Sequence, residues 1–91
     1  MNRATAEEIA RAAMTLARAL EDLSGLVLRN RPRRQIDPLM EHAREMLVIL
    51  NELVTAVADD EPAKAQGREM LDRLSAEFQM LEREIKGGFL Q

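Results

Sequence analysis

The chain has 91 residues, 46% hydrophobic and 32% charged, a balance typical of one globular domain rather than of a disordered chain. It has no cysteine, which excludes disulfide bonds and thiolate metal sites. Its formal net charge of -3 argues against general binding of nucleic acids, because their phosphates attract basic surfaces.

The first predicted helix covers residues 5–29. Thr5 and Glu8 have the spacing of a capping box, in which each side chain bonds the backbone of the other residue. Apolar residues then follow at alternating spacings of four and three, a heptad pattern that favours packing along one seam. The seam contains Ile9, Ala13, Leu16, Leu20, Leu23 and Val27. This pattern predicts one long amphipathic helix.

Four arginines stand within six residues after this helix, namely Arg29, Arg31, Arg33 and Arg34. Pro32 lies among them, where a turn must join two helices. A nucleic-acid site would need a wider basic face, or aromatic residues interleaved for stacking on bases. We therefore expect solvated turn residues, with contact to an acidic partner as an open alternative.

The second predicted helix covers residues 38–58. Asp37 followed by Pro38 is typical of a helix start, because aspartate caps the first amides and proline has no N–H to leave unpaired. The heptad spacing recurs in Leu39, Ala43, Met46, Leu50, Leu53 and Val57.

The third predicted helix covers residues 62–86, and a flexible tail is expected over residues 87–91. The helix should begin near Pro62 and end before Gly87 and Gly88, since glycine commonly follows a helix. Its seam contains Gly67, Leu71, Leu74, Phe78, Leu81 and Ile85.

Both connections between the predicted helices are short, which places consecutive helices antiparallel to each other. No alternation of apolar and polar residues indicates a strand. The sequence therefore predicts an all-α fold for residues 1–91, a single elongated antiparallel three-helix bundle with heptad-type packing. Dimerisation of this bundle is left open.

The three predicted helices have unequal apolar faces. At about 100° per residue, the apolar arc is about 200° on the first helix, about 180° on the second and about 100° on the third. The first two helices thus carry more apolar surface than the third can cover, and large exposed apolar patches usually mark interfaces. We expect a groove on helices one and two that is filled by a second copy or by a partner's amphipathic helix. The candidate partner-binding residues are Leu26, Leu28, Met40, Leu47 and Val54.

No set of residues indicates catalysis, a cofactor or a metal site, so we expect a protein that is not an enzyme. His42 is the only histidine. A phosphotransfer domain would carry Lys and Gly three and four residues later, but Glu45 and Met46 stand there, so this function ranks third. The six methionines are first interpreted as residues that fill gaps in the core, with an adaptable binding surface as the alternative. Met14 and Met80 fall outside the seams, which adds some support to the alternative.

Residues 19–54 resemble the small helical export chaperones of flagellar and related type III secretion systems. These chaperones have a long first helix, a short polar turn, and an Asp-x-Leu that opens a second helix with a charged residue about a turn further in. Asp37, Leu39 and Arg44 occupy the comparable positions. The resemblance implies a cytosolic chaperone that binds the amphipathic terminal segment of a filament or hook-associated protein. A self-assembling structural or regulatory bundle is the alternative.

The segment nearest the N-terminus contains acidic residues where a secretory signal would need an unbroken apolar region. No later run approaches the roughly 18 apolar residues of a membrane span. We therefore expect a cytoplasmic protein.

Overall fold

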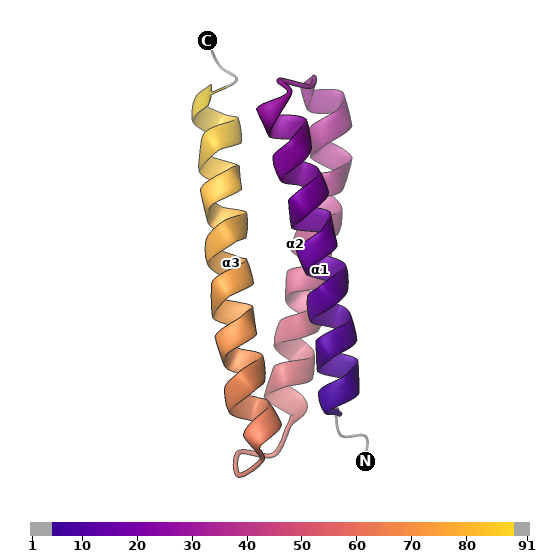
Figure 1. The fold of residues 1–91 in the computed structure, drawn as a ribbon, viewed down its shortest axis with the longest axis vertical. Helices are drawn as coiled ribbons and strands as arrows, with labels where there is room; N and C mark the ends of the chain where they lie inside the picture. The colour runs from indigo at the N-terminus through magenta and orange to yellow at the C-terminus, as the bar shows by residue number, and fades with distance from the viewer. Residues whose placement is uncertain (1–4, 89–91) are drawn as a thin grey trace.

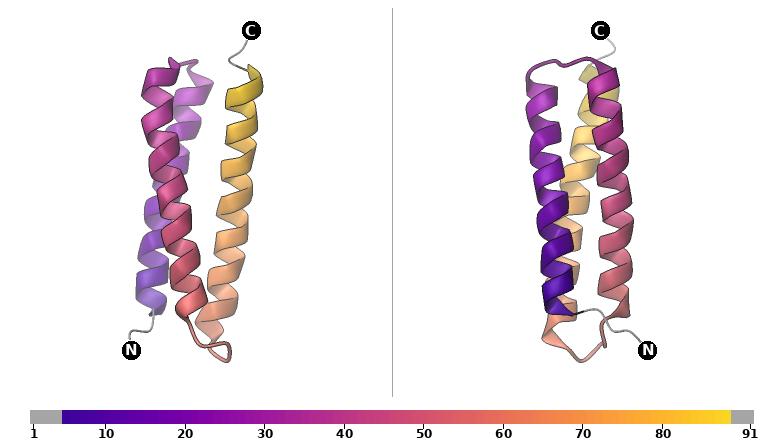
Figure 2. Two further views of the ribbon diagram at one scale, coloured as in Figure 1. Left: turned by 180° about the vertical axis from the view of Figure 1, so that it is seen from behind. Right: turned by 90° about the vertical axis from the view of Figure 1, so that its right-hand side faces the viewer.

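The computed structural model describes residues 5–88, which form three helices: α1 (Ala6–Leu28), α2 (Arg33–Ala56) and α3 (Pro62–Gly88). The helices lie side by side along one axis, and the molecule measures 48 × 17 × 16 Å (Figure 1). α1 and α3 run in the same direction, and α2 runs in the opposite direction (Figure 2). The prediction of an elongated all-α bundle with antiparallel consecutive helices is confirmed, and no strand occurs within residues 5–88.

The start of α1 is held by the capping box. The backbone N–H of Glu8 donates to the Thr5 hydroxyl at 3.1 Å, and the backbone N–H of Thr5 donates to the Glu8 carboxylate at 3.3 Å. Two amides that the first helical turn cannot pair internally are thereby satisfied. The predicted seam of α1 is also confirmed, because its first five residues are buried and only Val27 is half-buried.

The end of α1 is closed by a Schellman motif centred on Asn30. The backbone N–H of Asn30 donates to the carbonyl of Val27, and that of Arg31 donates to the carbonyl of Leu26, both at 3.0 Å. This pattern requires a left-handed residue, and Asn30 has a φ of 53°. Asparagine tolerates that conformation better than most residues with a side chain do.

The left-handed conformation of Asn30 leads to a first prediction. Asn30→Ala should lower the free energy of unfolding by about 1 kcal/mol, because alanine has no polar side chain to ease the left-handed backbone. Asn30→Gly should leave it unchanged or raise it, since glycine is the preferred residue there. Urea unfolding of both variants measures the difference. Equal midpoints for the two variants would contradict the left-handed cap.

α2 begins at Arg33, so the prediction that it starts at Pro38 is wrong. Pro32 is extended, and its carbonyl accepts from the amides of Gln35 at 2.9 Å and Ile36 at 3.3 Å. The additional turn buries Ile36 completely. That burial contributes roughly 1.5–3 kcal/mol, comparable to the cost of about 3 kcal/mol for a proline inside a helix. Pro38 is therefore tolerated in the second turn.

The arginine cluster is divided by this earlier helix start. Arg29 and Arg31 lie in the turn as expected, whereas Arg33 and Arg34 belong to α2. All four side chains are exposed, and the Arg33 Nε donates to the Asp37 carboxylate at 3.0 Å. Asp37 therefore pairs with an arginine one turn earlier instead of capping the helix. An exposed pair of this kind contributes under about 1 kcal/mol.

The buried face of α2 differs from the predicted seam. It consists of Ile36, Met40, Ala43, Leu50, Val54 and, just beyond the helix, Val57. On a helical wheel its centre is turned by about 50° from the predicted seam. Leu39, Met46 and Leu53 of that seam are only half-buried.

Met40 and Val54 were predicted to line an exposed partner-binding flank of α2, and this prediction is wrong. Both side chains are buried in the core, with exposed fractions of 8% and 2%. The reason is that α3 covers this flank: a Cβ at Gly67 would lie only 2.9 Å from Cγ2 of Val54.

Lys64, in the first turn of α3, holds the connection from α2 to α3 in place. Its ammonium donates to the carbonyls of Thr55 at 3.4 Å and Val57 at 3.0 Å, at the end of α2. It also pairs with the Asp59 carboxylate at 2.8 Å, and this hydrogen bond and the charge of Lys64 lower the pKa of Asp59 below its ordinary value. α2 thus ends at Ala56 instead of residue 58.

α3 continues to Gly88, two residues beyond the predicted end, so residues 87 and 88 are helical and not part of a flexible tail. The remainder of the predicted tail, residues 89–91, lies outside the described residues.

Candidate interaction groove

Five large apolar side chains of the described residues are exposed, and three of them border the space between α1 and α3. Met14 and Met80 are 58% exposed and Leu28 is 80% exposed. The other two, Val48 and Ile49, are adjacent on α2. Single exposed apolar residues are ordinary, but apolar residues that border one depression indicate an interaction site.

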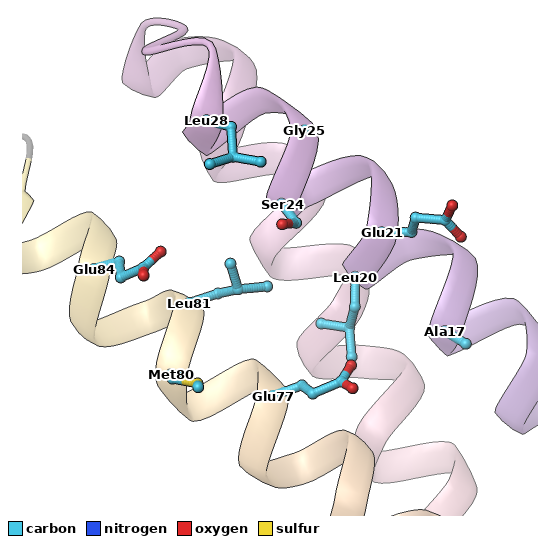
Figure 3. Close-up of a pocket in the computed structure, with 10 residues that line it drawn as sticks. All are labelled: Ala17, Leu20, Glu21, Ser24, Gly25, Leu28, Glu77, Met80, Leu81 and Glu84. Atoms are coloured by element: carbon cyan, nitrogen blue, oxygen red, sulfur yellow. The ribbon is translucent and has the colours of Figure 1, made fainter.

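Two hollows form a groove between α1 and α3. The first, of about 360 Å³, is lined by Ala10, Ala13, Met14, Ala17, Met70, Arg73 and Leu74. The second, of about 700 Å³, is lined by Ala17, Leu20, Glu21, Ser24, Gly25, Leu28, Glu77, Met80, Leu81 and Glu84 (Figure 3). Because Ala17 lines both, the two hollows adjoin. We call the pair the α1–α3 groove, with a lower hollow near Met14 and an upper hollow near Leu28.

The groove exists because α1 presents small residues toward it. Ala10, Ala17 and Ser24 recur at a spacing of seven, which places them on one line along the helix. None of them can reach across to α3, where Met70, Glu77 and Glu84 recur at the same spacing. A line of small residues opposite longer ones therefore leaves a depression along the helix axis.

The upper hollow is acidic. Glu21, Glu77 and Glu84 are its charged residues, and none of its ten lining residues is Lys or Arg. Figure 3 shows Glu77 and Glu84 directed across the hollow toward α1, whereas Glu21 points away from α3. Arg73, in the lower hollow, is the one charged residue among the seven that line it. The two halves of the groove thus differ in charge.

The predicted partner-binding residues are separated by the fold. Leu28 lines the upper hollow, but Leu26 and Leu47 are half-buried against the core, and Met40 and Val54 are inside it. The groove also lies between α1 and α3 instead of on helices one and two. Residues that the prediction omitted include Glu77 and Glu84, whereas Met14 and Met80 had been singled out as lying off the seams.

A smaller hollow of about 220 Å³ between α2 and α3 has a structural explanation. Arg44 donates to Glu41 at 2.8 Å and to Glu82 of α3 at 3.1 Å, and its guanidinium lies 5.7 Å from the centre of the Phe78 ring. The Arg44–Glu82 pair crosses from α2 to α3 at this hollow. Arg44, one of the residues that carry the chaperone resemblance, therefore joins α2 to α3 in this structure.

The described residues offer no centre for metal chemistry. Within residues 5–88, no three His, Asp or Glu side chains gather so as to hold a metal ion. His42 is exposed on α2. No helix in this part of the chain has both the length and the hydrophobicity needed to cross a membrane.

Comparison with models of protein families, with curated proteins and with solved structures finds no match. The function must therefore be argued from the groove itself. The resemblance to export chaperones stays a prediction.

Proposed function

We propose that the protein is a non-enzymatic interaction module whose α1–α3 groove binds an amphipathic helix of a partner protein. The observation that carries this proposal is that Met14, Leu28 and Met80 are all exposed along one groove. Covering apolar surface contributes roughly 25 cal/mol for each Å² removed from water. Methionines suit such a surface, because their flexible side chains adapt to different partners.

The shape of the groove supports a helix as the bound element. From Ala10 to Leu28 the groove follows α1 over 19 residues, a rise of about 27 Å at 1.5 Å per residue. A helix of similar length would place apolar side chains at every third or fourth residue against Met14, Met80 and Leu28. This is the helix-in-groove mode of recognition, in which a few apolar anchors supply most of the binding energy.

A more specific form of the proposal is a cytoplasmic secretion or flagellar export chaperone. Its support is the resemblance in residues 19–54, and a groove for an amphipathic helix agrees with the cargo that the resemblance implies. The alternative is a self-assembling bundle, which the adjacent exposed residues Val48 and Ile49 on α2 favour.

A pair of matched variants tests the proposal. The probe is an uncharged synthetic peptide of about 18 residues, with leucine at every third or fourth position and alanine or glutamine elsewhere. Met14→Glu with Met80→Glu should weaken its binding at least about ten-fold in calorimetry, because the added carboxylates would have to be desolvated. Val48→Glu with Ile49→Glu should leave binding unchanged.

The same two variants can also contradict the proposed function. If the α2 variant abolishes peptide binding, or if the wild type sediments as a dimer that only the α2 variant dissociates, self-assembly through α2 replaces the groove proposal. Circular dichroism of both variants should show unchanged helix content, since all four replaced residues are exposed.

A further inference from the structure

The lining of the upper hollow has an excess of negative charge. Its only charged residues are three glutamates, of which Glu77 and Glu84 are directed across the hollow. The C-terminal ends of α1 and α3, which run in parallel, also lie at this end of the bundle, together with the N-terminal end of α2 and its Arg33 and Arg34. A helix C-terminus has a partial negative charge from its unpaired carbonyls.

Two basic residues lie near the upper hollow without belonging to its lining. The Arg29 Nε donates to the carbonyl of Gly25 at 3.1 Å, at the rim of the hollow. Lys86, in the last turn of α3, lines the smaller hollow between α2 and α3. Neither belongs to the ten residues that line the upper hollow, so the carboxylates of Glu77 and Glu84 face the groove without a basic lining residue.

A second copy of the chain is a poor match for this groove. Two grooves placed face to face in parallel would bring Glu77 and Glu84 of one copy against the carboxylates of the other. In the antiparallel arrangement these glutamates would meet only Arg73, which already pairs with Glu69 at 4.0 Å. On α2, the exposed apolar residues Val48 and Ile49 could also contact a second copy, but Glu45 and Glu52 beside them would bring like charges together there. Like charges across an interface disfavour association. The groove therefore suits a partner of opposite charge.

We infer that the partner is a basic amphipathic helix with Lys or Arg in its N-terminal half, bound antiparallel to α1 and α3. This inference rests on the proposed function. In this direction the partner's cations lie opposite Glu77 and Glu84, and its positive N-terminal end lies beside the C-terminal ends of α1 and α3. Its C-terminal half covers the apolar lower hollow around Met14, where Arg73 is the only charged lining residue.

Three peptides with the same leucine positions test the charge and the direction. One carries three lysines in its N-terminal half, one carries them in its C-terminal half, and one carries three glutamates in its N-terminal half. The first should bind the full chain about ten-fold more tightly than the third, and more tightly than the second. The advantage should shrink in about 0.5 M NaCl, because salt screens exposed charges.

A variant and a spin label complete the experiment. Glu77→Gln with Glu84→Gln should remove the preference for lysine while leaving the affinity for the uncharged peptide unchanged. A nitroxide on the N-terminus of the first peptide should broaden the amide signals of residues near Leu28 and Glu84 in NMR spectra, and spare those near Ala10 and Met70.

The outcomes separate this inference from the proposed function. If the uncharged peptide binds and the lysine and glutamate peptides bind equally well, the charge preference is wrong and the proposed function stands. If the nitroxide broadens signals near Ala10 instead, the antiparallel direction is wrong. If none of the peptides binds, the proposed function and the inference fail together.

Discussion

Ile36→Ala should lower the free energy of unfolding by about 2–4 kcal/mol, a large part of the stability of a domain of this size. The structure places Ile36 in the first turn of α2 with no exposed surface. Truncation would remove three buried carbon atoms and leave a cavity that the two neighbouring helices can only partly fill. Urea unfolding followed by circular dichroism measures the loss.

Ile49 provides a control of the same residue type on the same helix. It is 46% exposed, so Ile49→Ala should cost well under half as much as Ile36→Ala. If the two variants unfold at the same urea concentration, residues 33–37 do not form a packed turn, and α2 begins near Pro38 after all.

Gly67→Ala should lower the free energy of unfolding by about 1–2 kcal/mol, although alanine is the better helix former by about 1 kcal/mol. The added Cβ would lie 2.9 Å from Cγ2 of Val54 and 3.4 Å from Cγ2 of Ile9, and both side chains are buried. Both are β-branched and have few alternative rotamers. Part of α3 must therefore move away from α1 and α2. The thermal midpoint and urea unfolding both report this effect.

Gly25→Ala is the matched control, because its Cβ would meet only the flexible Arg29 side chain, at 3.4 Å. That variant should be unchanged in stability or gain up to about 1 kcal/mol. Combining Gly67→Ala with Val54→Ala should cost less than the sum of the two single changes, since the second removes the atom that clashes. A rise in stability for Gly67→Ala alone would show that the helices are not so closely packed.

The heptad spacing was sufficient to predict three helices, their order and the seam of α1, because each of these depends on local pattern. The start of α2 could not be predicted in this way. Asp37 and Pro38 match a helix start locally, but the burial of Ile36 against other helices favours an earlier one. The rule for helix starts considers only neighbours along the chain, whereas the gain from Ile36 depends on tertiary packing.

The position of the groove could not be predicted from the apolar arcs either. An arc of about 180° on α2 is wider than the surface that its neighbours cover, so the pattern leaves open which part is buried. The close approach of α3 at Gly67 decides this, because it buries the flank with Val54. Leu28, Met14 and Met80 were recognisable as residues off the seams. Their position along one groove follows only from which flanks of α1 and α3 lie next to each other.

The parallel direction of α1 and α3 has a consequence for the stability of the protein when no partner is bound. A helix bound antiparallel to both would complete an up-down-up-down four-helix bundle, of which this chain supplies three members. Folding and recognition would then be thermodynamically linked: a partner present at 100 times its dissociation constant adds about 2.7 kcal/mol to the free energy of unfolding. Chains that lack a partner would unfold more often and be degraded sooner, so the amount of partner in the cell would set the amount of this protein.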